Sequence, residues 1–307
     1  MVKRTLYFGN PAYLSLSNRQ MVVEKPSDGD LPFGDAPLRR TIPIEDIGVV
    51  VIDNRQVTVT SALMSALLDN NAAVITCDEK SMPAGLLLPL ESNTVQSERF
   101  RSQIDASLPL KKQLWQQTVQ SKISNQAAVL KYVSGEDARN MIIWSGQVRS
   151  GDSENMEGRA AAFYWKNIFP ELPFFVRGRY DGAPNNLLNY GYAILRAVIA
   201  RALVSSGLLP TLGIHHCNRY NAFCLADDVM EPYRPYVDRL VVDIMADGNT
   251  CPQLTRETKA RLLEIPVMDV VIDGRRSPLM IAASQTTASL AKCFGGELRK
   301  IVYPEMQ

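Results

Sequence analysis

The chain has 307 residues, of which 46% are hydrophobic, and its formal net charge is +1. This length suits one large domain or two modest ones, and the apolar fraction is that of an ordinary globular protein. The near-neutral charge neither indicates nor excludes a nucleic-acid partner, because a DNA-binding protein can gather its cations on one face.

The five cysteines are widely spread, odd in number and never spaced as Cys-x-x-Cys, which argues against both a zinc ribbon and a disulfide-stabilised fold. Such a chain fits a reducing compartment. The basic N-terminal segment is not followed by the apolar run of a signal peptide, and no apolar stretch approaches the roughly 18 residues of a membrane span. We therefore expect a cytoplasmic protein without a membrane-spanning segment.

Short apolar runs separated by turn residues dominate the N-terminal part of the chain and predict a small β-rich domain. The expected strands are 6–8, 13–16, 21–24, 47–52, 57–60 and 73–77. One helix is expected among them at residues 61–68, with Ser61 as its N-cap.

The pattern changes after Pro89, and apolar residues then recur at intervals of three or four, which is typical of helices. One helix is expected at 156–165, with Ser153 near its start. Another is expected at 185–206, because Gly207 stands where a helix ends and a proline soon follows.

Together these patterns predict an α+β fold with two domains. A small N-terminal β-rich domain is expected at residues 1–91, and a larger, all-helical C-terminal domain at residues 92–307. The change in periodicity locates the boundary to within several residues.

Both histidines of the chain stand side by side, as His215 and His216, just before an acidic cluster. The acids of this cluster are Asp227, Asp228 and Glu231. Spacings of three and four residues place Glu231 on one helix face with the other two, and Pro232 indicates a bend at Glu231. An imidazole with carboxylates suits Mg²⁺ or Mn²⁺, which can activate a nucleophile and stabilise charge on a phosphoryl group. The alternative is a pair of packing histidines beside the solvated face of a helix.

Three stretches of the sequence, in this order, resemble the spacer-acquisition integrases of CRISPR systems, the Cas-one family. The first is EGRAAAFYW at 157–165, and the second is NNLLNYGY at 185–192, where Asn186 replaces the family's usual alanine. The third joins GIHH at 213–216 to LADDVMEPYRP at 225–235. The amino-acid sequence of the third stretch is most similar to that of the branch that accompanies a type II effector nuclease.

The resemblance implies that Glu157, His216 and Glu231 are the catalytic residues and hold Mg²⁺ or Mn²⁺. Asp228 is then a candidate to orient His216 or a bound water, with a plain helix-face acid as the alternative. His215 is expected to be structural.

The resemblance also implies a DNA substrate, which directs attention to cations and aromatic residues. Arg177 and Arg179 flank a glycine and are candidates to bind phosphates, with an ordinary exposed loop as the alternative. Asn185 and Tyr192 match the second motif and are candidate DNA-binding residues, although aromatic residues at helical spacing more often belong to the core.

The implied activity is that of a metal-dependent DNA integrase, whose prespacer 3′-hydroxyl attacks a phosphodiester at the edge of a CRISPR repeat. The implied partners are double-stranded DNA, the small second CRISPR adaptation protein, and a second copy of the chain within a larger integration complex, dimerised through the β-rich domain. The type II effector nuclease is a further candidate partner. Two other functions stay open: a metal-dependent nuclease that uses water on branched or foreign DNA, and a non-catalytic DNA-binding scaffold.

Overall fold

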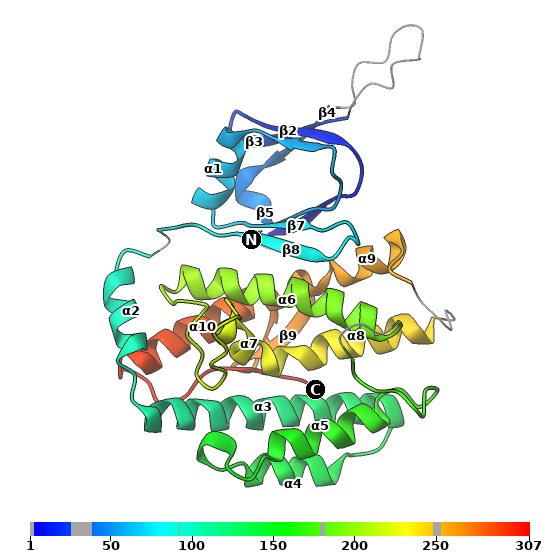
Figure 1. Cartoon of the computed structure of the whole chain (residues 1–307), viewed down its shortest axis with the longest axis vertical. Helices are drawn as coiled ribbons and strands as arrows, with labels where there is room; N and C mark the ends of the chain where they lie inside the picture. The colour runs from blue at the N-terminus through cyan, green and yellow to red at the C-terminus, as the bar shows by residue number, and fades with distance from the viewer. Residues whose placement is uncertain (1–2, 26–38, 92, 179–181, 248–252) are drawn as a thin grey trace, which may run out of the picture. The chain divides into compact units, whose positions relative to one another are not determined.

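The computed structural model describes residues 3–25, 39–91, 93–178, 182–247 and 253–307 (Figure 1). The chain divides into two compact units, Met1–Ser92 and Asn93–Gln307. The predicted boundary between residues 91 and 92 lies next to this division.

The first unit contains two four-stranded sheets and one helix. One sheet has the order β1-β5-β7-β8, and the other has the order β4-β3-β2-β6. The strands are β1 (Arg4–Phe8), β2 (Ala12–Ser17), β3 (Gln20–Glu24), β4 (Arg39–Pro43), β5 (Ile47–Ile52), β6 (Val57–Val59), β7 (Ala73–Cys77) and β8 (Pro83–Leu87). The helix is α1 (Ser61–Asp69), and a short 3-10 turn spans Ile44–Asp46.

The core of this unit forms where α1 packs against the strands. Leu63 and Leu67, one helical turn apart, are fully buried in the same cluster as Leu14 and Val50. The six predicted strands are confirmed, but β4 and β8 were not predicted, because their short sequences carry charged residues or a proline at sheet edges. The predicted N-cap is wrong by one residue: Thr60, not Ser61, accepts the N–H of Leu63.

The second unit is mostly helical, as predicted. Its helices are α2 (Gln96–Ile104), α3 (Leu108–Ser134), α4 (Arg139–Gln147), α5 (Met156–Asn167), α6 (Asn185–Ser205), α7 (Cys224–Met230), α8 (Arg234–Ala246), α9 (Arg256–Leu262) and α10 (Leu279–Phe294). Short 3-10 turns span Ser150–Asp152, Glu231–Tyr233 and Ile265–Val267. Helices α3, α4 and α5 lie side by side, and α6 packs against α7, α8 and α10 (Figure 1).

The prediction of an all-helical second unit needs one correction. Strands β9 (Asp269–Ile272), β10 (Arg275–Pro278) and β11 (Pro304–Glu305) form a small antiparallel sheet in the order β10-β9-β11. Asp273 and Gly274, both with positive φ, make the tight turn between β9 and β10. An Asp-Gly pair after a β-branched run is a recognised hairpin signal, which the helical pattern around it obscured.

Helix α6 packs against α7, α8, α9 and α10, and most of its residues are buried. Gly207, with φ of 73°, follows the end of the helix in the left-handed conformation predicted for it. Gly191 allows close packing, because a Cβ there would lie 2.5 Å from the side chain of Val237. Among the described residues, α6 is long and apolar enough to cross a membrane, but 78% of its apolar window is buried inside the fold, as in a core helix.

Candidate metal centre

The structure brings Glu157 and Glu231 together at one ammonium group, that of Lys122 on α3. Nζ of Lys122 lies 2.6 Å from Oε1 of Glu157 and 2.6 Å from Oε2 of Glu231. Burial lowers the pKa of Lys122, but Glu231 and Glu157 outweigh it and raise the pKa above its usual value. Two acids that are far apart in the sequence therefore lie around one positive charge.

Glu231 occupies the bend that Pro232 predicted. Helix α7 ends at Met230, and Glu231 begins the 3-10 turn that leads into α8. The residue is only 6% exposed, and its Oε1 lies 3.0 Å from Nε of Arg234. Burial raises the pKa of Glu231, but Arg234 and Lys122 more than offset this and hold the pKa below its usual value. Glu231 is therefore an anion at neutral pH despite its burial.

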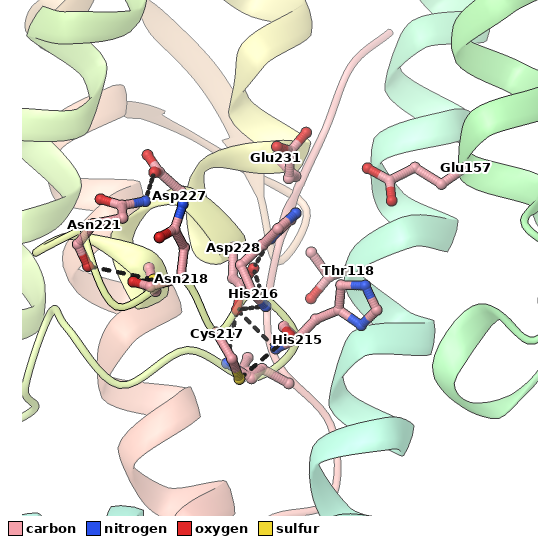
Figure 2. A network of polar contacts seen from close by, with 12 residues as sticks. Thr118, Glu157, His215, His216, Cys217, Asn218, Asn221, Asp227, Asp228 and Glu231 are labelled. Carbon is pink, nitrogen blue, oxygen red and sulfur yellow. Dashed lines mark hydrogen bonds and ion pairs between the residues drawn. The ribbon is translucent and has the colours of Figure 1, made fainter.

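Glu157 lies in the first turn of α5, which is the predicted helix at 156–165. Asp152 holds this turn, because its two carboxylate oxygens accept the N–H groups of Met156 and Glu157 at 2.8 and 2.9 Å. Asn155 is the N-cap and accepts the N–H of Gly158. Figure 2 shows the Glu157 side chain reaching from this helix toward the region of Glu231 and His216.

His216 is oriented by Asp228, whose side chain is fully buried. Oδ1 of Asp228 lies 2.5 Å from Nδ1 of His216, and Oδ2 accepts the backbone N–H groups of Ile214 and His215 at 2.7 and 2.9 Å (Figure 2). The hydrogen bond to Asp228 is the largest cause that raises the pKa of His216. The loop therefore wraps around one carboxylate, which directs Nε2 of His216 away from Asp228. The alternative of a solvated helix-face acid is wrong for Asp228.

His215 stacks on Trp115 of α3, with ring centroids 4.3 Å apart and planes at 3°. The ring of His216 meets the same indole edge-on, at 5.5 Å. Trp115 is itself fully buried, so it forms a rigid support for both histidines. This packing gives His215 the structural position that we expected.

Asp227 points to a different partner from its neighbour Asp228. Its Oδ1 lies 2.7 Å from Nε of Arg196 on α6, and its Oδ2 accepts from the side-chain amide of Asn221. Asp227 therefore ties the loop of residues 213–223, the histidine loop, to α6. Its partners differ from those of Glu231.

Two residues at the centre were missed by sequence reasoning, Lys122 and Trp115. They lie seven positions apart on α3 and so face the same side of that helix. The sequence contains a signal for α3 itself, but nothing in it indicates that this face meets the histidine loop and the two glutamates.

The candidate DNA-binding residues lie beside this centre, in contact with one another. Arg177 donates to the side-chain oxygens of Asn185 and Asn189 at 2.9 and 2.7 Å. Asn185 also accepts the N–H of Gly178 and donates to the carbonyl of Val176, so it fastens the preceding loop to the start of α6. Arg179 lies outside the described residues.

Asn185 and Tyr192 are both buried, with exposures of 3% and 7%. Tyr192 donates to Oδ1 of Asp238 at 2.5 Å, and Tyr164 donates to the other oxygen of that carboxylate at 2.9 Å. Base stacking requires an exposed ring face, so this structure assigns Tyr192 to the core and Asn185 to the support of Arg177. Direct contact of either residue with DNA stays a prediction that their burial argues against.

A pocket of about 310 Å³ adjoins the centre. Its walls include Lys122, Glu231, Trp165, Arg177, Tyr192 and Arg234. Two guanidinium groups lie over the Tyr192 ring, with Arg177 5.3 Å and Arg234 4.7 Å from its centroid. The three cations of the lining outnumber its two carboxyl groups, Glu231 and Asp238, which suits an anionic ligand such as a phosphate.

The donor set fits a hard divalent cation, because Glu157 and Glu231 supply carboxylate oxygens and His216 supplies an imidazole. The two carboxylates already gather around a positive charge, that of Lys122. Within the described part of the chain, no three His, Cys, Asp or Glu side chains are arranged closely enough to hold a metal as they stand. Metal binding would therefore require the side chains around Lys122 to rearrange.

A family profile described as CRISPR associated protein Cas1 matches residues 6–263. The chain belongs to the Cas1 family. This Cas1-family protein is 37% identical over 291 residues to the CRISPR-associated endonuclease Cas1 of Neisseria meningitidis serogroup C (strain 8013), a match that covers 94% of this chain and 91% of the relative. It is 30% identical over 244 residues to the CRISPR-associated endonuclease Cas1 1 of Pyrobaculum aerophilum, a match that covers 73% of this chain and 80% of the relative.

Solved structures share the fold of this Cas1-family protein. A casposase bound to integration product has a TM-score of 0.77 at 20% identity, covering 98% of this chain and 92% of the other. A Cas1 protein from Thermotoga maritima has a TM-score of 0.74 at 17% identity, covering 96% and 98%. A chain of a Cas6-RT-Cas1–Cas2 complex has a TM-score of 0.72 at 20% identity, covering 99% of this chain and 36% of that one. The predicted family and fold class are confirmed.

Proposed function

We propose that this protein is an integrase of CRISPR adaptation, which joins prespacer 3′-hydroxyl ends into the CRISPR repeat by metal-dependent transesterification. The observation that carries the proposal is the convergence of Glu157 and Glu231 on one cationic position, beside a His216 that Asp228 orients. Membership of the Cas1 family supports the proposal, and so does the likeness in fold to a casposase bound to integration product.

Glu157, His216 and Glu231 are the residues that would hold Mg²⁺ or Mn²⁺. When bound, such an ion supplies Lewis acidity that activates the attacking hydroxyl and stabilises charge at the phosphorus. Asp228 accepts from Nδ1 of His216 and so fixes the tautomer that leaves Nε2 as the ligand atom. Arg234 keeps Glu231 ionised in a buried position, as a metal ligand requires.

The reaction exchanges one phosphodiester for another and therefore needs no nucleotide cofactor. The prespacer 3′-oxygen forms a bond to phosphorus while the phosphorus–oxygen bond of the repeat strand breaks, and the released strand end gains the proton as a new 3′-hydroxyl. Arg177 and Arg234, which both line the adjoining pocket, are the cations that would hold DNA phosphates in line. Arg179, which lies outside the described residues, is proposed to add a further phosphate contact.

The proposed partners are prespacer and repeat DNA, a second copy of the chain joined through the β-rich unit, and the small second adaptation protein. The fold is shared with a chain of a Cas6-RT-Cas1–Cas2 complex and, at a TM-score of 0.56, with TtCas1 in a TtCas1–DNA complex. The type II effector nuclease is a further proposed partner, and the cytoplasm is the proposed location.

A nuclease is the second candidate, because the curated relatives carry the name endonuclease. The same centre would then activate water in place of a 3′-hydroxyl. A non-catalytic scaffold is less well supported, since binding alone does not require a glutamate pair and an oriented histidine around one buried position.

The test is a strand-transfer assay with a prespacer duplex, a supercoiled plasmid that carries a repeat, the second adaptation protein and Mn²⁺. Wild type is compared with His216→Ala and Glu231→Gln, and DNA binding is measured in parallel. We expect both variants to bind DNA and to lose joining by at least about 100-fold. Joining at the wild-type level by both variants would contradict the proposed centre, and nicking without joining by wild type would favour the nuclease.

A further inference from the structure

Lys122 places its ammonium group between the two carboxylates of the proposed metal centre, 2.6 Å from an oxygen of each. Its side chain is 12% exposed and comes from the middle of α3, two helical turns after Trp115. The position of Lys122 is therefore set by the helix that also supports the two histidines.

An ammonium group and a divalent cation cannot share this position. Mg²⁺ lies about 2.0–2.1 Å from its oxygen ligands, so it would stand closer to the carboxylates than the ammonium does. Two cations only a few ångströms apart in a partly buried site repel each other strongly. Metal binding through Glu157 and Glu231 therefore requires the ammonium to leave.

The fold gives the displaced ammonium room to move. Lys122 and Glu231 both line the pocket of about 310 Å³, and a lysine side chain has four rotatable bonds with which to enter it. Arg177 and Arg234 already line this pocket, and both oxygens of its other carboxyl group, Asp238, already accept hydrogen bonds from tyrosines, so the ammonium is less favourably placed there than between the two glutamates. The displacement therefore costs free energy, which the metal must supply.

We propose that Lys122 is the resident counter-ion of the metal-free centre, which holds Glu157 and Glu231 together until a divalent cation displaces it. This inference rests on the proposed metal-dependent function and deepens it. Lys122 is a positioning residue that assembles the two carboxylates in advance and, by competing with the metal, lowers the affinity of the centre for metal.

The test is Mn²⁺ binding to the metal-free full-length protein, measured by isothermal titration calorimetry and by the electron paramagnetic resonance signal of unbound Mn²⁺. The variants are Lys122→Met and Lys122→Gln, and the matched control is Lys131→Met. Lys131 is exposed on the same helix, about 13 Å further along its axis. Its substitution by Met changes the net charge of the protein as much as Lys122→Met does. Glu231→Gln establishes that the measured binding belongs to the proposed centre.

We expect Lys122→Met to bind Mn²⁺ about tenfold or more tightly than wild type, with Lys122→Gln shifted in the same direction and Lys131→Met unchanged. We also expect the metal-free Lys122→Met protein to melt at a lower temperature than wild type, and Mn²⁺ to raise its melting temperature by more. A residue with only a structural role would weaken metal binding when removed.

Equal or weaker Mn²⁺ binding by both Lys122 variants, together with Glu231-dependent binding by wild type, would overturn the inference and leave the proposed function intact. Wild-type binding that is absent or independent of Glu231 would overturn the proposed metal centre itself. If Lys122→Met fails to fold without metal, the milder Lys122→Gln gives the affinity comparison, because its amide still donates to one carboxylate.

Discussion

Oδ1 of Asp228 lies 2.5 Å from Nδ1 of His216, while the other oxygen of this buried carboxylate holds the backbone of the loop before it. One side chain therefore sets both the path of the loop and the orientation of the imidazole. Its charge also favours the protonated form of His216, whose pKa is raised chiefly by this hydrogen bond.

Asp228→Asn removes this charge at nearly constant volume, so we expect the pKa of His216 to fall. Protonation of His216 stabilises the fold below the unfolded-state pKa of 6.5, and this contribution is lost as the pH rises through the raised folded-state pKa. A metal ion binds only the neutral imidazole, so the Mn²⁺ affinity of wild type should weaken as the pH falls through the folded-state pKa of His216. In Asp228→Asn, the same weakening should begin at a lower pH. Proton NMR titration, with His215→Phe to assign the two histidine signals, measures the shift. Equal His216 pKa values in the two proteins would count against this account.

The two neighbouring histidines should respond differently to the same substitution. His215→Phe keeps a flat ring on Trp115, so we expect strand transfer within about twofold of wild type. His216→Phe removes the ligand nitrogen and should lower strand transfer by at least about 100-fold. His215→Ala, which removes the stack, should lose about 0.5–1.5 kcal/mol in urea unfolding. Loss of transfer in His215→Phe with normal stability would give His215 a direct part in the reaction.

Asp238 should make stability depend on pH. Burial raises its pKa to about 6, because the hydrogen bonds from Tyr192 and Tyr164 offset only part of the cost of charging it. The folded state therefore binds a proton that the unfolded chain has released. This contribution is fully present below the unfolded-state pKa of 3.8 and is lost as the pH rises to about 6.

The measurement is the free energy of unfolding of wild type and Asp238→Asn in urea, whose difference isolates this group. Between about pH 4 and about pH 7, wild type should lose roughly 1–3 kcal/mol relative to the variant, which cannot titrate at this position. A difference that stays constant over this range would show that Asp238 is ionised throughout.

Asn185 should act on DNA through the loop that it holds. Asn185→Ala removes the acceptor for Arg177 and Gly178 and the donor to Val176. We therefore expect the free energy of unfolding to fall by about 1–3 kcal/mol and proteolysis at residues 174–178 to be faster. DNA binding should weaken while Mn²⁺ affinity stays unchanged. Asn167→Ala, at an exposed asparagine of α5, is the control and should leave proteolysis as in wild type. An intact loop with weakened DNA binding would instead indicate direct contact of Asn185 with DNA.

The parts of the site that could be predicted are those with a local signal. Pro232 indicated the bend at Glu231, and the spacing of the helix at 156–165 placed Glu157 in a first turn, where the structure has both. The choice of these acids came from the family motifs, since the residues alone left Asp227 and Asp228 as rivals.

The parts that escaped prediction depend on tertiary contacts. Lys122 lies in a regular helix, and its meeting with two distant glutamates arises only when α3 packs against α5 and the turn after α7. Tyr192 and Asn185 were assigned to DNA because they belong to a motif, but their hydrogen bonds run to Asp238 and to the loop before α6. A motif marks residues that matter without saying whether they touch the ligand or support those that do.

We propose that a 3′-hydroxyl, rather than water, is the nucleophile at this centre. The most direct measurement compares prespacers that end in a 3′-hydroxyl with otherwise identical prespacers that end in a 3′-deoxy sugar, using wild-type protein, the second adaptation protein, Mn²⁺ and a repeat-bearing plasmid. We predict joined product and an equal number of nicks with the hydroxyl ends, and neither with the deoxy ends. Nicking of the plasmid to the same extent with both prespacers would contradict the claim and identify water as the nucleophile.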